Sequence, residues 1–560
     1  MTVIRIARST FEPIRSRPPR MCHLTLPGLA AVLGLALAQP ASAQTPPYDL
    51  VLRNGRIVDG TGSPWHRADL AIRGDTIVRI APSISDCAVR VIDIEGRVIA
   101  PGFIDVHTHA RRGIFDVPTA DNYVRQGVTT VMEGADGSSP VPLGPFLARL
   151  EALPKSLNIG TFIGQGSIRS TVIGEVNRQP AADELHKMRA LVEQAMKEGA
   201  FGLSSGLFYV PGTFTPLEEL IELARVAGRF GGYHNSHMRD EAARVVESVQ
   251  ETIAVGERGG LPTHVSHHKV IGQGNWGRSI ETLRLIDEAR ARGVDVTIDQ
   301  YPYTASSTRI QAALLPAWAQ EGGHDSVLKR LSDPDTRAKI KGEVARIIRM
   351  EQGGGDPKNV VVAYCAWDDS LGGKNLAEIA RLRGMEPTVD NAAEVALWIT
   401  ERGGCQGVFH AMSEEDLERI LRHPATMIAS DGEIPIGIGF PKVGVPHPRS
   451  YGTFARVLAV YVRERKIVTL EDAVRKMSSL PAQRLGLQDR GLLRPGMKAD
   501  IAVFDPARVR DTATYDKPHQ YAEGFSHVIV NGEVVFERGA MTAARPGKVL
   551  YGSAKARPAP

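Results

Sequence analysis

Two histidines one residue apart, His107 and His109, are the first residues of this sequence that could do chemistry together. They end the apolar run 103–106, which is typical of a buried strand. Side chains two positions apart lie on the same side of a strand, so both imidazoles can reach one metal ion. A His-x-His pair alone is explained equally well by packing, so the metal hypothesis depends on further ligands elsewhere.

Further groups that can bind a metal follow other strand-like runs. His237 and His267 end two such runs about 30 residues apart, the length of one βα unit, and Asp431 follows the apolar run 427–430. The carboxyl ends of parallel strands meet on one rim of a barrel. Four strands that each bring a histidine or an aspartate to that rim predict a metal centre there.

Strand-like runs alternate with amphipathic stretches through the middle of the chain, which is the rhythm of a parallel α/β fold. The eight strand candidates are residues 103–109, 128–133, 158–163, 201–205, 232–237, 263–267, 294–299 and 425–430. The clearest helices between them cover residues 185–197, 217–230, 241–256 and 280–292. Eight βα units predict a closed (β/α)8 barrel, similar to a TIM barrel, with an open doubly wound sheet as the alternative.

Short β runs separated by turns, which are typical of antiparallel strands, flank the barrel at both ends of the chain. We expect residues 44–100 and 486–550 to fold together as one small β domain beside a barrel that spans residues 101–485. Residues 551–560, which are rich in proline and alanine, are expected to form a loose tail.

The seventh and eighth strand candidates are much farther apart than one βα unit. We therefore expect an insertion at about residues 304–425, with helices at 335–349 and 414–422 and a strand at 360–363. An insertion after the carboxyl end of a strand overhangs the expected active site, so a lid or a specificity element is the natural interpretation.

The composition is that of a globular protein, with 42% hydrophobic and 23% charged residues among 560, which excludes disordered, collagen-like and coiled-coil chains. The first 43 residues hold five arginines and one glutamate, an excess that equals the formal net charge of +4. The remaining chain gives no electrostatic reason to expect a nucleic-acid or an anionic-membrane partner.

The same 43 residues resemble a signal peptide. An arginine-rich start precedes the apolar stretch 24–38, and the small residues Ala41 and Ala43 suit cleavage before Gln44. We expect an exported protein, periplasmic in location, with an uncleaved membrane anchor as the alternative. Three cysteines follow, at 87, 365 and 405, and we expect buried thiols there, with one disulfide and one thiol as the alternative.

Taken together, these motifs resemble the amidohydrolase superfamily, and in particular its N-acyl-D-amino-acid deacylase (D-aminoacylase) branch, over nearly all of residues 48–550. The matching segments are residues 100–109, 127–131, 236–241, 266–269, 301–303, 430–432 and 446–449. The resemblance implies a metal-dependent hydrolase barrel, a β-sandwich built from both chain ends and an insertion between strands seven and eight.

The sequence departs from the pattern of the superfamily at the group that bridges two metals. Many members use a carboxylated lysine after strand four, and residues 201–205 contain no lysine. In the deacylase branch a cysteine after strand two bridges instead, and Asp136 stands at that position, with Glu133 as a rival. A carboxylate can bind zinc, but its harder oxygen would also accept Mn²⁺ or Co²⁺, so one or two zinc ions are expected with those ions as alternatives.

The resemblance implies a role for each metal-binding residue. The metal ligands would be His107, His109, Asp136, His237, His267 and Asp431. Asp431 would also be the general base that accepts a proton from water and delivers it to the leaving nitrogen, with a role as a ligand alone as the alternative.

Four residues would bind the α-carboxylate of the substrate. Lys269 lies two positions after His267 and faces the same cavity if the strand continues, and Arg449 offers a planar fork for a carboxylate. The resemblance adds Tyr301 and Ser307.

These assignments predict a zinc-dependent amidohydrolase whose partner is a small N-acyl-D-amino acid, cleaved to a carboxylate and a free D-amino acid. The D configuration comes from the resemblance alone. A dipeptidase-like or cyclic-amide hydrolase is one alternative. A binding module without activity is another, although such a module should have lost its metal ligands.

Overall fold

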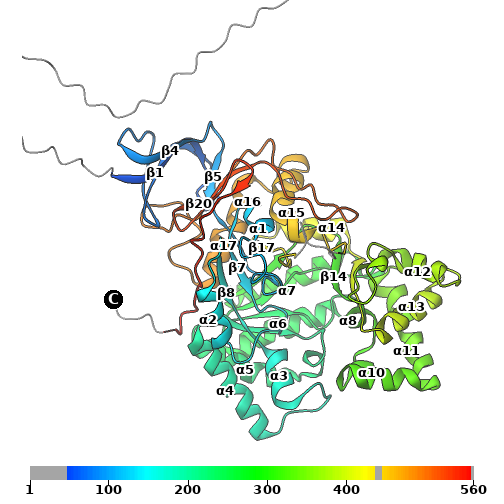
Figure 1. Ribbon diagram of the computed structural model, residues 1–560. Helices are drawn as coiled ribbons and strands as arrows, with labels where there is room; N and C mark the ends of the chain where they lie inside the picture. Colours follow the sequence, from blue (N-terminus) through cyan, green and yellow to red (C-terminus); the bar gives the residue numbers. More distant parts are fainter. Residues whose placement is uncertain (1–46, 436–443, 556–560) are drawn as a thin grey trace, which may run out of the picture.

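The computed structural model describes residues 47–435 and 444–555, and parallel strands form its centre (Figure 1). The barrel strands are β6 (Phe103–Asp105), β7 (Val128–Glu133), β8 (Asn158–Thr161), β9 (Ile163–Gly164), β10 (Gly202–Gly206), β11 (Tyr233–His237), β12 (Thr263–Val265), β13 (Val296–Gln300) and β17 (Thr426–Ile428). They pair in the orders β6-β7-β8 and β9-β10-β11-β12-β13-β17, all in parallel. The amide of Phe201 also donates to the carbonyl of Thr161, which joins the two groups at one seam.

The second seam of the barrel lies between the first and last strands. The amide of Asp431 donates to the carbonyl of His107 at 2.9 Å, and the amide of His109 donates to the carbonyl of Gly432 at 2.7 Å. The eight predicted strands thus close into a (β/α)8 barrel, which confirms the fold class and excludes the open sheet. Because these seam residues include three predicted metal ligands, closing the barrel also assembles part of the site.

Helices surround the strands on the outside of the barrel (Figure 1). They are α1 (Asp121–Val124), α2 (Gly144–Ala152), α3 (Gln165–Ile173), α4 (Ala182–Glu198), α5 (Leu217–Arg229), α6 (Val245–Gly259), α7 (Ser279–Ala291), α14 (Glu414–Arg422), α15 (Arg449–Arg456), α16 (Leu470–Met477) and α17 (Ser479–Leu485). In α5 the first turn carries Glu218 and Glu219 and the last turn carries Arg229, charges that favour the two helix ends. Its leucines and alanines at 220–227 face the strands, so sequence periodicity predicts which face is buried.

One nine-stranded sheet combines both ends of the chain. Its strands are β1 (Tyr48–Ile57), β2 (His66–Arg73), β3 (Thr76–Ala81), β4 (Ala88–Asp93), β5 (Val98–Pro101), β18 (Ile501–Phe504), β19 (Phe525–Val530), β20 (Glu533–Glu537) and β21 (Ala540–Met541). Side chains from β1, β2, β18 and β19 share one apolar core, as predicted for a domain built from both ends. The expectation of purely antiparallel strands was wrong, because β1 pairs in parallel with β4 and β5.

The joint between this sheet and the barrel is a buried polar cluster. Asp500 precedes β18 and forms an ion pair with Arg490. It also accepts hydrogen bonds from the amide of Asn531 at 2.7 Å and from the side chain of Asn158 at 3.2 Å. Since Asn158 begins the barrel strand β8, the carboxylate of Asp500 fixes the chain-end sheet to the barrel.

The insertion between β13 and β17 has its own apolar core and lies on the side of the molecule away from the chain-end sheet (Figure 1). Its elements are β14 (Ala305–Arg309), α8 (Ile310–Leu314), α9 (Ala317–Gln320), α10 (Gly323–Ser332), α11 (Pro334–Ile347), β15 (Val360–Tyr364), α12 (Leu376–Leu382), α13 (Val389–Glu401) and β16 (Gln406–His410). The strands form a small antiparallel sheet in the order β14-β16-β15.

Two sequence expectations need correction. Cys365 and Cys405 form a disulfide and are not separate thiols, because antiparallel pairing of β15 with β16 brings their ends together. The tail was expected to be loose from residue 551, but Tyr551 donates to Glu151 and the amide of Gly552 donates to Gly199, so its first residues lie against the barrel. Within the described residues, no helix is long and apolar enough to cross a membrane.

The disulfide should stabilise the insertion. It closes a loop of 40 residues, for which chain entropy predicts up to about 4 kcal/mol. We expect the double variant Cys365→Ser/Cys405→Ser to lose about 2–4 kcal/mol of unfolding free energy, measured by calorimetry and denaturant titration. Cys87→Ser, at an exposed position, is the control and should unfold like the wild type. Equal stability of the double variant would contradict the role of this bond.

Candidate metal centre and active site

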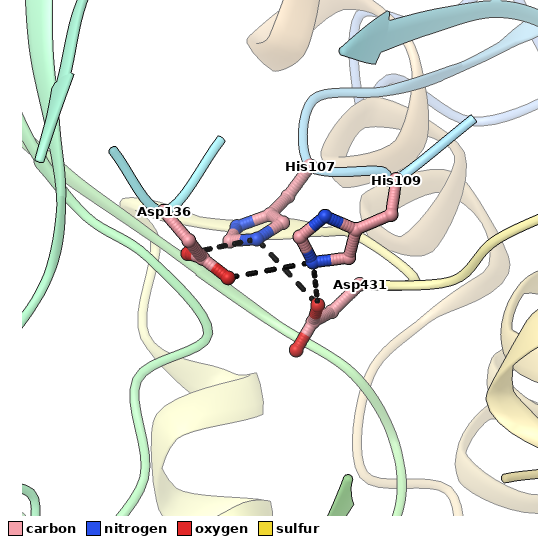
Figure 2. A group of neighbouring side chains, drawn as sticks. All are labelled: His107, His109, Asp136 and Asp431. Carbon is pink, nitrogen blue, oxygen red and sulfur yellow. Dashed lines mark hydrogen bonds and ion pairs between the residues drawn. The ribbon is translucent and has the colours of Figure 1, made fainter. Parts of the chain in front are cut away.

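The six predicted metal ligands lie together at the carboxyl end of the barrel. They come from the ends of five different strands: His107 and His109 follow β6, Asp136 follows β7, His237 ends β11, His267 follows β12 and Asp431 follows β17. Figure 2 shows both carboxylates directed at the imidazoles of His107 and His109. The position of a residue at a strand end, more than its spacing in the sequence, brings these groups together.

Asp136 is shared between two groups of possible ligands. One group contains His107, His109, Asp136 and Asp431, and the other contains Asp136, His237 and His267. The ligand atoms within each group lie within 4.8 Å of one another. Oδ1 of Asp136 lies 3.5 Å from Nε2 of His267 and 3.2 Å from Nε2 of His107, and Oδ2 lies 3.4 Å from Nε2 of His109. One carboxylate can therefore contact two ions.

The polar atoms of this cluster fit a metal. Nε2 of His107 and Oδ1 of Asp136 are buried without a hydrogen-bond partner in the described structure. Nε2 of His267 faces Nδ1 of His237 at 2.7 Å. A cation among these atoms would satisfy the unpaired groups and would give both imidazoles a common partner. Imidazole nitrogens and carboxylate oxygens are among the ligands that zinc binds in proteins.

Three of the predicted ligands have an unusual backbone. Asp136, His267 and Asp431 have φ values of 55°, 34° and 50°, in the left-handed region that residues other than glycine rarely adopt. Gly134 and Gly137 make the turn at Asp136 possible: a Cβ on Gly137 would lie 2.6 Å from the amide nitrogen of Gly206. Such strain persists only where the surroundings impose it, and it marks functional sites.

The charges of the cluster favour a cation between its members. Burial alone would raise the pKa of Asp136, but His107 and His237 outweigh burial and hold that pKa well below its usual value. Burial alone would lower the pKa of His107, but the carboxylates of Asp136 and Asp431 raise it well above its usual value. A metal would supply the positive charge that these carboxylates otherwise draw from protons, so metal binding should release protons.

Glu133, the rival of Asp136, does not join the cluster. Its Oε2 accepts the backbone amide of Arg111 at 2.8 Å, and its Oε1 lies 3.5 Å from the guanidinium of the same residue. The structure therefore places Asp136, and not Glu133, between the histidines.

The four predicted carboxylate-binding residues lie around the same site, and each cation has a carboxylate partner. Nζ of Lys269 donates to Glu241 at 2.7 Å, and Nη1 of Arg449 lies 2.7 Å from Oδ2 of Asp431. The hydroxyl of Tyr301 is buried without a hydrogen-bond partner in the described structure, and its ring lies 4.9 Å from the guanidinium carbon of Arg449. The hydroxyl of Ser307 donates to the carbonyl of Gly407, so it does not point freely into the site.

The insertion forms part of the wall of the site. Ser307 lies on β14, and its carbonyl accepts a hydrogen bond from Nη2 of Arg449 at 3.2 Å. The next residue, Thr308, donates to the hydroxyl of Tyr209, whose ring lies 4.7 Å from that of His237. The first strand of the insertion thus contacts Arg449 directly and reaches the predicted metal ligand His237 through Tyr209.

Two buried carboxylates escaped the sequence analysis. Asp299, near the end of β13, accepts the amide of His267 and contacts His264, both at 2.6 Å, and lies 3.6 Å from Nδ1 of His107. Glu241 lies 3.1 Å from Nδ1 of His267 and also holds Lys269. The position of Asp299 near the end of strand seven was the available signal; Glu241 offered none, because it follows β11 in an irregular segment.

Comparisons with known proteins support the same assignment. The amidohydrolase family model matches residues 90–536. D-aminoacylase of Alcaligenes xylosoxydans xylosoxydans is 36% identical over 91% of this chain and 99% of that protein, and N-acyl-D-glutamate deacylase of the same organism is 36% identical over 91% and 98%. The crystal structure of N-acyl-D-glutamate deacylase from Bordetella bronchiseptica, with zinc and a phosphonate mimic of the tetrahedral intermediate, matches with a TM-score of 0.77 and 34% identity, over 90% and 99% of the two chains.

Removing the shared carboxylate should affect both metal positions. We expect Asp136→Ala to lose most of its bound metal, because Asp136 contacts ligands of both groups. Metal content of purified protein, measured by inductively coupled plasma mass spectrometry, tests this. The control is Glu133→Gln, which changes the neighbouring buried carboxylate and should retain its metal. A wild-type metal content in Asp136→Ala would remove Asp136 from the ligand set.

Asp299 should hold the ligands in position. We expect Asp299→Asn to weaken metal binding by about 10- to 100-fold, since groups that orient ligating histidines typically contribute this much. Competition with a chelator measures the affinity directly. Asp500→Asn is the control, because Asp500 is a buried aspartate in the joint between sheet and barrel. An unchanged affinity in Asp299→Asn would mean that its contacts only support the fold.

Proposed function

Because this chain belongs to the amidohydrolase family, we propose that it hydrolyses the amide bond of N-acyl-D-amino acids, giving a carboxylate and a free D-amino acid. The observation that carries the proposal is the pair of ligand groups that share Asp136, with two cationic side chains beside them. The two relatives at 36% identity, which are named D-aminoacylase and N-acyl-D-glutamate deacylase, support the substrate class.

The enzyme is metal-dependent, and its own residues would provide the ligands. Asp136, His237 and His267 would hold one ion, and His107, His109 and Asp431 a second. A bound metal supplies Lewis acidity, which lowers the pKa of a water and polarises a carbonyl oxygen. Zinc suits this set of nitrogen and oxygen ligands, and Mn²⁺ or Co²⁺ could take its place.

Asp431 is the group that would move the proton. Its Oδ1 lies 3.1 Å from Nε2 of His109, whereas its Oδ2 points to Arg449. During hydrolysis a bond forms between the water oxygen and the carbonyl carbon, and the carbon–nitrogen bond breaks. Asp431 would accept the proton of the water and deliver it to the departing nitrogen, which leaves as an amine.

The α-carboxylate of the substrate would bind beside Oδ2 of Asp431, on the side away from the histidines. Arg449 and Lys269 supply positive charge there, and Tyr301 adds a buried hydroxyl. Ser307 borders the same position through β14. Two buried cations suit a small substrate with a free carboxylate better than a cyclic amide, which has none, so they favour deacylation over the cyclic-amide alternative.

Export to the periplasm is also part of the proposal. The signal-like residues 1–43 lie outside the described residues. The disulfide between Cys365 and Cys405 supports export, since such bonds persist mainly in oxidising compartments. We also propose the domain limits predicted from the sequence: the mature chain begins at residue 44, the barrel spans residues 101–485, and the second part of the β domain spans residues 486–550.

The direct test is amine release by the zinc-loaded mature protein from matched N-acetyl-D- and N-acetyl-L-amino acids. Leucine, methionine, glutamate and aspartate as side chains separate neutral from acidic substrates. We expect release from the D series at least about 100-fold faster than from the L series. Removal of metal should abolish activity. Release from dipeptides alone, or from the L series, would overturn the proposed substrate class.

A further inference from the structure

The residue expected to bind the substrate carboxylate already holds the expected general base. Nη1 of Arg449 lies 2.7 Å from Oδ2 of Asp431 as an ion pair, without the geometry of a hydrogen bond, and both side chains are only 7% exposed. Such a pair is stable only while each charge keeps a partner, because an unpaired buried charge is costly. One oxygen of the expected general base is therefore paired with a cation.

The two oxygens of Asp431 have different neighbours. Oδ1 faces Nε2 of His109 at 3.1 Å and Nε2 of His107 at 3.6 Å, on the side of the metal ligands. Oδ2 faces Arg449. The oxygen that is directed away from the metal ligands, and could accept a proton, is thus the one that the guanidinium occupies.

Arg449 is placed to exchange one carboxylate for another. Its Nη2 donates to the carbonyl of Ser307 at 3.2 Å, and its guanidinium lies over the ring of Tyr301. These contacts can hold the guanidinium in place while its Nη1 changes from one carboxylate to another. Lys269 cannot substitute for Arg449 without leaving Glu241, which holds its Nζ at 2.7 Å.

We infer that Arg449 makes the general base available only when a substrate carboxylate binds: the α-carboxylate takes the place of Asp431 on the guanidinium and releases Oδ2. The inference rests on the proposed deacylase function. The exchange keeps Arg449 paired throughout, so it avoids the cost of a buried unpaired guanidinium. An amide without an α-carboxylate offers no replacement partner, and Asp431 stays bound to Arg449.

This arrangement makes Arg449 a specificity-determining residue that acts on kcat. A contact that only binds substrate would change KM when the carboxylate is removed, whereas the exchange changes the rate at saturation. Specificity would then depend on whether the substrate releases Asp431, as well as on how tightly the pocket binds it.

The test compares the best D-substrate with its primary carboxamide, using metal-loaded wild type, Arg449→Lys and Arg449→Met. For wild type we expect kcat of the carboxamide to be at least about tenfold below that of the acid. Arg449→Met should change the two substrates in opposite directions. Its kcat for the carboxamide should rise above the wild-type value, while its kcat for the acid should fall below it. Arg449→Lys should retain part of the preference for the acid. Metal content and thermal unfolding are measured for each variant.

A second arm needs no variant. N-isopentylacetamide is N-acetylleucine without its carboxylate, and formate supplies the missing group. Formate should accelerate hydrolysis of this amide by wild type about tenfold, at concentrations that competitively inhibit the acid substrate. Chloride at equal ionic strength is the control.

Each outcome distinguishes the two claims. If wild type hydrolyses no N-acyl-D-amino acid, the proposed function fails and this inference fails with it. If wild type hydrolyses the acid, but the carboxamide reaches the same kcat with only a higher KM, Arg449 is a binding contact and the exchange is wrong. The exchange would also be wrong if folded, metal-loaded Arg449→Met lost activity equally toward the acid and the carboxamide, and formate did not accelerate hydrolysis of N-isopentylacetamide by wild type.

Discussion

The need to balance buried charge around Asp136 constrains the rest of this structure. One carboxylate lies between imidazoles from three strands, within hydrogen-bonding or ion-pairing distance of each. Such a group cannot be buried alone, and its neighbours cannot be drawn together without a counter-charge. The closed barrel provides this environment because its strand ends converge, and the seam between His107 and Asp431 makes closure and site assembly one event.

The buried carboxylates that contact the predicted ligands also need partners for their charge. Asp299 binds the amide of one ligand and lies beside the ring of another, while Glu241 contacts a ligand and a cation. Each of these carboxylates is buried and has at least two partners, so a change at one position is transmitted to the ligands. The unusual φ of His267 is held in this way, since Asp299 accepts its amide.

Sequence periodicity was sufficient for the barrel, because buried parallel strands and amphipathic helices leave strong local patterns. The ends of β11 and β13 and the helix α14 are close to their predicted limits. The parallel pairing of β1 and the disulfide were not predictable, since both depend on which distant strands become neighbours. Residue type and strand position were enough to nominate five of the expected metal ligands, whereas Asp136 came from the family resemblance. The turn that Gly134 and Gly137 permit places Asp136, and not Glu133, among the histidines.

The pairing of Arg449 with Asp431 shows why the remaining part of the site could not be read from the sequence. Sequence reasoning assigned each residue to a ligand in the working complex: the arginine to a substrate carboxylate, the aspartate to a metal and a proton. A buried charged group, however, must have a partner in every state of the cycle, including the state without substrate. In a site this enclosed, the carboxylate that pairs with Arg449 in one state competes with the carboxylate that pairs with it in the next, so the residues proposed to bind the substrate would also determine when the base is available.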